Sequence, residues 1–484
     1  MVAGILHEID VWLSQIDPRS ATAVSESHAA PDGSSNHYQY DTLNRLTTLT
    51  NSLTGQFGFG YDALSRRTQL TRPNGVNTNY AYDSVSHLLS VLHQVGSTTL
   101  DGAGYGYDFA GNRTSKTNYL NGITSNYGYD AIYELQQVTQ SNVTTESYSY
   151  DAVGNRLSSL GMSPYSYNPS NELTSTPSGS YTYDANGNTL TDASGKQYTW
   201  DFENRLVQAV IPGTGTTTFR YDPFGRRIQK SGPLGATNYL YDGATPLEEV
   251  DNAGNVLARY TQSGLIDESL GMLRSGVTSY YQADGLGSTS SLSNSAGTLA
   301  NTYTYDSFGK LTASTGTLLN PFQYTGREFD LETGIYEYRA RYYDQNVGRF
   351  ISEDPIAFRG GVNFYRYVLN NPVINVDPPG LGPSGWGNKS WTWTTRANCF
   401  ISYYACLAHI AETRQSLDQM TDDAVANTSD ATGSEGGYSN QRLKCGLNQD
   451  QNCKDALTRC TKLALTNPFP PPWWLKWLIG MGGK

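Results

Sequence analysis

The sequence predicts a mainly β protein, in which a long strip of β-hairpins precedes a small, mainly helical C-terminal domain. Three observations support this prediction. The 484 residues include 49 Gly and 36 Tyr and only 16% are charged, which suits short strands joined by tight turns. A Tyr-Asp pair recurs along the chain. After residue 381 this repeat stops, all five cysteines occur, and apolar residues fall near helical spacing.

The recurring pair defines a repeat unit. The pairs are Tyr40-Asp41, Tyr61-Asp62, Tyr82-Asp83, Tyr107-Asp108, Tyr129-Asp130, Tyr150-Asp151, Tyr183-Asp184, Tyr221-Asp222, Tyr241-Asp242 and Tyr305-Asp306, with the variants Tyr167-Asn168 and Trp200-Asp201. From position 40 to position 241 the steps between pairs run from 16 to 25 residues. A step of this length accommodates one strand, one turn and one return strand.

Each unit has the chemistry of a hairpin. The residue two before the Tyr is usually aromatic, as Phe59 is before Tyr61, which places both rings on one strand face. Turn residues such as 154–156 (Gly-Asn-Arg) follow the Asp, which can bond to the turn backbone. A lone hairpin is marginal, so neighbours must form a continuous sheet. The rings could form a carbohydrate platform, but their recurrence with every unit favours packing between strands.

Charge and cysteine content divide the chain into two parts. Residues 1–381 carry 23 Lys and Arg against 36 Asp and Glu, whereas residues 382–484 carry 10 against 8. The acidic first part argues against nucleic-acid binding by that part. The odd number of cysteines leaves at least one thiol unpaired in a monomer, and their spacing matches no zinc motif. We therefore expect no metal and no cofactor. The cysteines are Cys399, Cys406, Cys445, Cys453 and Cys460.

The N-terminal residues contain no recognisable export signal. The stretch MVAGILHEID has no basic segment, and its apolar run ends at His7. No apolar run reaches the roughly 18 residues that a membrane span requires. We expect residues 1–35 to be a truncated or poorly ordered segment. A secreted or cell-surface location would then depend on a delivery apparatus that the sequence does not reveal.

The unit Y-D-x-x-G-N-R-L resembles the YD repeat of Rhs proteins, teneurins and the C components of bacterial insecticidal toxin complexes. Residues 283–381 resemble the Rhs-associated core, with NPFQYTGREFD at 320–330, YRARYYD at 338–344, SEDP at 352–355 and DPPGL at 377–381. The resemblance covers roughly residues 36–381. It implies that residues 36–282 form a spiral β-shell, that residues 283–381 plug it, and that the variable tail 382–484 is a toxin or effector.

The same resemblance implies self-cleavage at the Leu381–Gly382 bond by Asp354 and Asp377 with Arg341. Two close carboxyls share one proton, so one can accept a proton from water while the other donates to the scissile group. An arginine can orient a carboxylate or stabilise an oxyanion. The alternative is structural, because Asp-Pro often opens turns and Arg–Asp pairs are common ties.

Two functions remain open at this stage. The first is a shell that carries and releases an effector by autoproteolysis, in interbacterial competition or toxin delivery. The second is a non-catalytic, cell-surface repeat protein for adhesion or carbohydrate binding. In the tail, helices are predicted over about 398–420 and 450–465. There, His409 and Glu412 lie three residues apart, as in a metal or acid–base site or on an ordinary helix surface. The Trp-rich end suits a membrane interface or packing on the tail's own helices.

Geometry predicts that the shell is incomplete. A strand residue covers roughly 16 Å² of sheet. The 381 residues before the cut would then enclose a lumen of about 17 Å radius, which equals the outer radius of a cargo of this size. We therefore expect an open, curved sheet that needs missing N-terminal repeats or a partner shell subunit. An immunity protein for the tail and a delivery apparatus are further expected partners.

Overall fold

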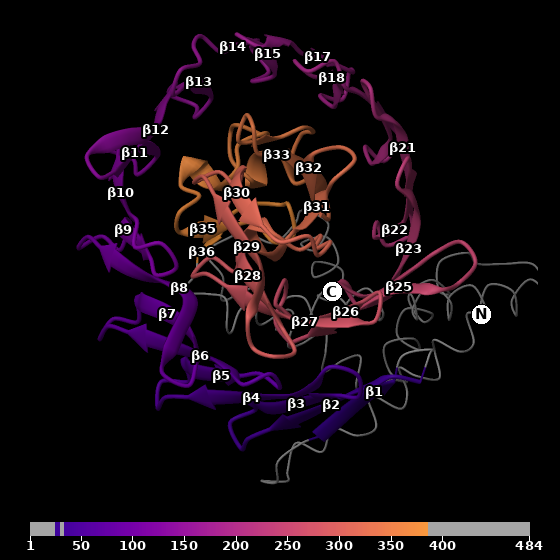
Figure 1. Ribbon diagram of the computed structural model, residues 1–484. Helices are drawn as coiled ribbons and strands as arrows, with labels where there is room; N and C mark the ends of the chain where they lie inside the picture. Colours follow the sequence, from indigo (N-terminus) through magenta and orange to yellow (C-terminus); the bar gives the residue numbers. More distant parts are fainter. Residues whose placement is uncertain (1–24, 30–32, 386–484) are drawn as a thin grey trace, which may run out of the picture. The chain divides into compact units, whose positions relative to one another are not determined.

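A computed structural model describes residues 25–29 and 33–385, and the predicted helical tail lies outside them. The mainly β prediction is confirmed for these residues, in which the strands of the two largest sheets follow one another in chain order. All pairs within these sheets are antiparallel, as expected for stacked hairpins. The strip of hairpins curves around a smaller group of strands, β31–β34 (Figure 1). We call residues 316–385, which include this group, the plug.

The elements have the following bounds. The first sheet contains β1 (Ser25–Ala29), β2 (Ser35–Tyr40), β3 (Leu46–Asn51), β4 (Gly55–Tyr61), β5 (Arg67–Thr71), β6 (Val76–Tyr82), β7 (Leu88–Val95), β8 (Thr98–Tyr107), β9 (Arg113–Asn118), β10 (Thr124–Tyr129), β11 (Leu135–Gln140), β12 (Val143–Tyr150) and β13 (Arg156–Ser159). A short sheet follows with β14 (Ser166–Tyr167), β15 (Leu173–Thr176) and β16 (Gly179–Ser180).

The next sheet contains β17 (Thr182–Tyr183), β18 (Thr189–Thr191), β19 (Gln197–Trp200), β20 (Leu206–Ile211), β21 (Gly215–Tyr221), β22 (Arg227–Gly232), β23 (Gly235–Asp242), β24 (Thr245–Val250), β25 (Val256–Gln262), β26 (Ser269–Arg274), β27 (Val277–Ala283), β28 (Thr289–Asn294), β29 (Leu299–Tyr305) and β30 (Leu311–Thr315). The plug contains η1 (Tyr324–Gly326), β31 (Glu328–Asp330), β32 (Ile335–Tyr338), β33 (Arg341–Asp344), β34 (Arg349–Phe350), η2 (Ala357–Arg359), η3 (Val368–Asn370), β35 (Asn375–Val376) and β36 (Ser384–Gly385). The hairpin strip thus continues through residue 283, where the sequence placed the start of the core segment, to Thr315.

The Asp of most repeats closes its turn, whereas Asp242 lies within β23. Asp62 Oδ1 accepts hydrogen bonds from the backbone N–H groups of Leu64 (3.0 Å) and Arg66 (2.9 Å), and Ser65 has a φ of 60°. A short polar side chain that bonds to the turn backbone is what this conformation requires. The same two bonds recur at Asp41, Asp83, Asp108, Asp130, Asp151, Asp184, Asp201, Asp222, Asp251, Asp284 and Asp306.

The Tyr of each repeat ties it to the repeat before. The Tyr61 hydroxyl donates to the carbonyl of Leu46, the first residue of the preceding return strand, at 2.9 Å. In the variant repeat the indole Nε1 of Trp200 donates in the same way to the Thr189 carbonyl at 2.7 Å. The hydroxyl, which Phe lacks, therefore explains why Tyr stands here. The bond recurs at Tyr82, Tyr107, Tyr129, Tyr150, Tyr167, Tyr183, Tyr221, Tyr241 and Tyr305.

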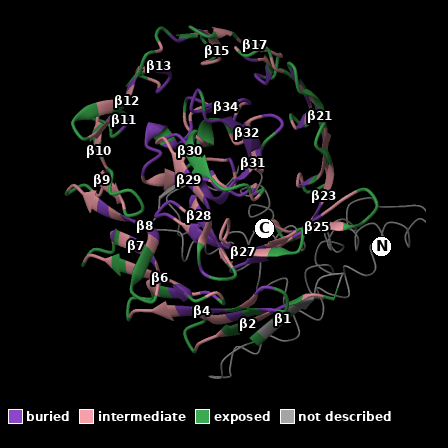
Figure 2. Cartoon of the chain, viewed as in Figure 1, coloured by how far each residue is buried: buried purple, intermediate pink, exposed green. Residues whose placement is uncertain are grey.

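The aromatic residue two positions earlier packs into the interior. Phe59 is buried in one cluster with Tyr38, Leu49 and Leu70, and Tyr61 packs against that cluster. The interpretation of these rings as packing residues is confirmed for the repeats that the structure describes. Many turns of the strip are exposed, whereas the plug strands are buried (Figure 2).

After one turn the strip meets its own first part through side-chain contacts. We call β1–β13 the first winding and β25–β30 the second winding. Thr54, which follows β3, lies 2.6 Å from Thr261 of β25 through their Oγ1 atoms. Lys116 of β9 forms an ion pair of 2.7 Å with Asp284, which follows β27. These contacts hold the second winding against the first.

The plug is bonded to the strip around it. Arg227 of β22 forms a 2.5 Å ion pair with Asp330 of β31. From another part of the strip, the Gly187 carbonyl accepts a 2.8 Å hydrogen bond from the Tyr365 hydroxyl. The interior of the curved strip is thus occupied by the chain's own residues, which carry the candidate site. The prediction that the shell is too small to enclose the tail concerns residues outside the described ranges and stays a prediction.

Candidate active site

The structure brings together the three residues predicted to act. Arg341 opens β33, Asp354 follows β34, and Asp377 follows β35 directly. Arg341 Nη2 lies 3.2 Å from Asp354 Oδ2 and 3.3 Å from Asp377 Oδ2. The two carboxyl groups therefore meet at a single guanidinium nitrogen, although 23 residues separate them in sequence.

The site is almost closed to solvent. The exposed fractions are 2% for Arg341, 6% for Asp354 and 1% for Asp377. Burial raises the pKa of Asp377 to about 6, although Arg341 opposes the shift and Asp354 adds to it. Burial also raises the pKa of Asp354, again opposed by Arg341. A carboxyl that is half protonated near pH 6 can act as an acid there.

Asp377 lies against the bond predicted to break. Its Oδ1 accepts a hydrogen bond from the Leu381 N–H at 2.9 Å, and its Oδ2 accepts one from the Gly382 N–H at 3.0 Å. Gly382 N is the amide nitrogen of the Leu381–Gly382 bond. The carboxyl with the raised pKa is therefore within hydrogen-bond distance of the atom that would leave as an amine.

The segment before this bond is held by its carbonyl groups. The Pro378 carbonyl accepts a hydrogen bond from Arg339 Nη1 at 2.5 Å. The Pro379 carbonyl accepts one from Ala340 N at 3.2 Å, and the Gly380 carbonyl accepts one from Arg341 Nε at 2.5 Å. Arg341 thus contacts the carbonyl just before the one that water would attack. It also meets each carboxyl through one nitrogen and not as a bidentate pair. The geometry supports an orienting role for Arg341 more directly than an oxyanion contact.

Gly380 allows this close approach. Its φ is 68°, and a Cβ atom there would lie 2.3 Å from the Tyr338 carbonyl oxygen. Both the backbone conformation and the space therefore require glycine. This accounts in physical terms for the Gly of the DPPGL motif.

Sequence reasoning missed a set of arginines that point into the interior of the strip, of which Arg227 binds the plug and Arg67 binds a loop of the second winding. Arg67, Arg113, Arg156 and Arg227 all stand five residues after the Asp of a repeat, where other repeats have Leu, as at Leu46, Leu135 and Leu206. All four point into the interior; for example, Arg227 is 1% exposed. The alternation of Leu and Arg at one position of the repeat was the available signal.

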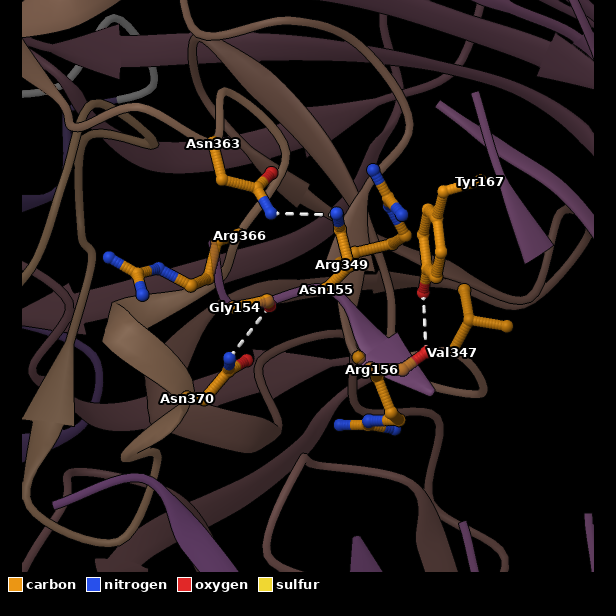
Figure 3. Close-up of a pocket in the computed structure, with 10 residues that line it drawn as sticks. Gly154, Asn155, Arg156, Tyr167, Val347, Arg349, Asn363, Arg366 and Asn370 are labelled. Carbon is orange, nitrogen blue, oxygen red and sulfur yellow. Dashed lines mark hydrogen bonds between the residues drawn. The ribbon is translucent and has the colours of Figure 1, made fainter. Parts of the chain in front are cut away.

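Two cavities adjoin the plug. A cavity of about 390 Å³ is lined by Leu381, Pro379, Arg339 and Asp267, among others, so it adjoins the candidate bond. The other has a volume of about 10 Å³, which is room for one water molecule. Figure 3 shows its asparagines bonded to the strip, and its three arginines pointing in different directions. These arginines do not converge on one anion position.

Within the described residues, no three His, Cys, Asp or Glu side chains are grouped as metal ligands. No helix of the described part is long and apolar enough to cross a membrane.

Comparison with known proteins places this geometry in context. The family model of the teneurin YD-shell matches residues 94–373, and that of the RHS repeat matches residues 40–78. The tRNA3(Ser)-specific nuclease WapA of Bacillus spizizenii is 32% identical over 309 residues, 62% of this chain and 11% of WapA. The double-stranded DNA deaminase toxin A of Burkholderia cenocepacia is 29% identical over 58% of this chain and 22% of its own length.

Among solved structures, the pore form of the Photorhabdus luminescens Tc holotoxin matches with a TM-score of 0.63 and 22% identity, over 78% of this chain and 22% of that one. This likeness concerns the fold. The chain spans only about a tenth of WapA and about a fifth of the other two proteins.

Proposed function

The chain belongs to the teneurin YD-shell family, and from this premise we propose that it is a shell of a toxin-delivery protein that cuts itself between Leu381 and Gly382. The observation that carries the proposal is the contact between Asp377 Oδ2 and Gly382 N at 3.0 Å. Relatives that share the repeat are a nuclease and a deaminase toxin. In this proposal residues 382–484 are the cargo.

The proposed reaction is hydrolysis of one peptide bond. Asp354, when ionised, takes a proton from a water molecule that attacks the Leu381 carbonyl carbon. In the resting structure Gly382 N–H donates to Asp377 Oδ2. When the Leu381 carbonyl carbon becomes tetrahedral, a lone pair forms on Gly382 N, and Asp377, when protonated, gives it a proton as the carbon–nitrogen bond breaks. The products are the Leu381 carboxylic acid, which then loses its proton to water, and the Gly382 amine. Arg341 orients both carboxyls and, because it is a single cation between them, favours the state with one proton on the pair.

Mass spectrometry of the freshly made chain tests the proposal. We expect fragments of residues 1–381 and 382–484. Because Asp377 must be protonated and its pKa lies at about 6, cleavage should slow as pH rises through that value. It should slow again at low pH, when Asp354 also takes a proton. An intact chain throughout this pH range would contradict the proposal and favour the alternative of a non-catalytic adhesion or carbohydrate-binding protein.

Further hairpin repeats are the proposed partner of the shell, on a longer form of this chain or on a separate subunit. The residue two after the turn Asp is exposed in the first winding, 65% at Leu43, 66% at Leu64 and 70% at Val85. The equivalent Phe308 in the second winding is 1% exposed, because it packs on Tyr148 of the first winding and on plug residues such as Tyr324. A preceding winding would cover the exposed row as the first winding covers one side of Phe308.

Replacing Leu43, Leu64 and Val85 together with Asn tests this surface. If the row binds hairpins, the unmodified chain should self-associate at high concentration and the triple variant should do so less, as measured by sedimentation velocity. Identical sedimentation of the two proteins would argue against the row as a binding surface.

The tail as a toxin, an immunity protein that neutralises it, a delivery apparatus and a secreted or cell-surface location belong to the same proposal. Producing residues 382–484 alone in bacteria tests the toxin. If the full chain is cleaved but these residues do not slow bacterial growth, the toxin does not act on a bacterial target there. The carbohydrate-platform alternative gains nothing from the described residues, because their repeat rings pack into clusters such as those around Phe59 and Tyr105.

A further inference from the structure

The loop of residues 263–268, between β25 and β26, is fixed by the first winding. Arg67 of β5 forms a two-pronged ion pair with Glu268, in which Arg67 Nη2 lies 3.0 Å from Glu268 Oε2. Ser263 closes the loop, since its N–H donates to the Glu268 carbonyl at 3.1 Å. The position of this loop therefore depends on contact between the two windings.

The same loop holds the plug through Asp267. Asp267 Oδ1 lies 2.7 Å from Arg339 Nη2 and 2.6 Å from Arg327 Nη1. Its backbone fits closely against the plug, because a Cβ atom on Gly326 would lie 2.3 Å from the Asp267 carbonyl oxygen. Burial would raise the pKa of Asp267, but Arg327 and Arg339 hold it below its usual range. Asp267 therefore stays charged and paired.

Arg339 connects Asp267 to the segment that contains the predicted cleavage bond. Its φ is 58°, a conformation that a residue with a side chain rarely adopts without being held. Nη1 of Arg339 lies 3.3 Å from Asp267 Oδ2 and donates to the Pro378 carbonyl at 2.5 Å. Pro378 follows Asp377 directly. The contacts thus run without a gap from β5 through the loop to the backbone beside Asp377.

We propose that loop 263–268 couples closure of the strip to self-cleavage, with Asp267 and Arg339 as positioning residues. The inference rests on the proposed self-cleavage. Before the windings meet, the loop lacks its Arg67 anchor, so Asp267 cannot hold Arg339 in place. The Pro378 carbonyl is then released, and Asp377 loses its alignment with Gly382 N. Cleavage accordingly follows assembly of the shell. A misplacement of about 1 Å is enough to slow such a reaction about a hundredfold.

The test follows cleavage during cell-free synthesis of the full chain, with a short labelling pulse. Arg339→Ala should slow cleavage by about tenfold to a hundredfold. Arg67→Ala, which is remote from the site, should also slow it. Arg327→Ala is the matched control, because Arg327 binds the same Asp267 but does not contact residues 378–380. It should lower the melting temperature at least as much as Arg339→Ala while slowing cleavage less.

Chemical rescue separates positioning from stability. The cavity of about 390 Å³ is lined by Asp267, Arg339, Pro379 and Leu381 and can admit methylguanidinium once the Arg339 side chain is removed. We expect methylguanidinium to speed cleavage of Arg339→Ala and not of Arg327→Ala. Cleavage rates that merely follow melting temperature, without rescue, would overturn the inference, as would an unchanged rate in Arg339→Ala. An unmodified chain that never splits would overturn the proposed function itself.

Discussion

Replacing Asp377 with Asn is expected to leave the chain uncut. The side-chain amide keeps the size of the carboxyl and an oxygen that can accept a backbone N–H, so the turn at 377–382 should still form. It cannot deliver a carboxyl proton to Gly382 N, which lies 3.0 Å from Asp377 Oδ2 in the unmodified protein. Loss of a general acid or base slows a reaction by about a hundredfold to ten-thousandfold. Asp354→Asn should have an effect of similar size, because it removes the proposed base.

Intact-mass measurement over time gives the rate for each variant. Asp251→Asn is the matched control, since Asp251 makes the usual turn bonds in the strip and lies far from the plug in sequence. It should be cut at the rate of the unmodified chain. If both Asp354→Asn and Asp377→Asn still split at Leu381–Gly382, the assignment of these residues is wrong.

The second large effect is expected at Arg227, where replacement with Met should lower the free energy of unfolding by about 3–5 kcal/mol. Arg227 is 1% exposed and lies 2.5 Å from both Glu328 Oε1 and Asp330 Oδ2. Without Arg227, the two buried carboxyl groups of Glu328 and Asp330 remain. Lys230, which lies 3.3 Å from Asp330 Oδ1, then balances only part of their charge. The free energy lost with the two ion pairs exceeds the free energy gained by burying the apolar Met side chain.

The pH dependence of this loss has a definite sign. Burial raises the pKa of Glu328, with Arg227 opposing the shift, so without Arg227 the pKa should rise further. For Asp330 burial would also raise the pKa, but Arg227 and Lys230 hold it below its usual range. A group whose folded pKa is raised loses stability as pH rises through that pKa. The penalty of Arg227→Met should therefore be smaller in acid than above neutral pH.

Urea unfolding in the Asp377→Asn background measures this without interference from cleavage. Arg226→Met is the control, because Arg226 is the next residue in sequence but has a side chain that is 33% exposed and pairs with Asp222 on the strip itself. Exposed pairs of this kind contribute about 1 kcal/mol or less. Equal losses for the two variants would show that the buried cluster does not hold the plug.

Local chemistry made the repeat predictable. The Asp, Gly and Asn of a turn act within five residues, as at Asp151, Gly154 and Asn155, so their pattern in sequence is also their pattern in space. The tie between Tyr61 and the carbonyl of Leu46 was not predicted, because the acceptor is a backbone atom that leaves no mark on the sequence. The family motifs identified Arg341, Asp354 and Asp377, and geometry then brought them together.

Contacts between distant segments could not be predicted in this way. Asp267 meets Arg339 across 72 residues, and nothing in the loop 263–268 resembles a repeat motif or a site motif. Whether two such residues meet depends on how far the strip curves before it closes. That curvature is the sum of small twists in many hairpins, which a single sequence does not specify residue by residue.

The tyrosine tie between neighbouring repeats bears on how such a chain can change length during evolution. Each hydroxyl needs only a backbone carbonyl in the preceding hairpin, which any residue type provides, so a duplicated unit fits next to its neighbours immediately. Stability then grows by a similar increment with each added unit. Gain or loss of units is tolerated only where it does not shift arginines such as Arg67 and Arg227 from their partners in Glu268 and Asp330. Length should therefore vary most between these anchor points, and always by whole hairpins.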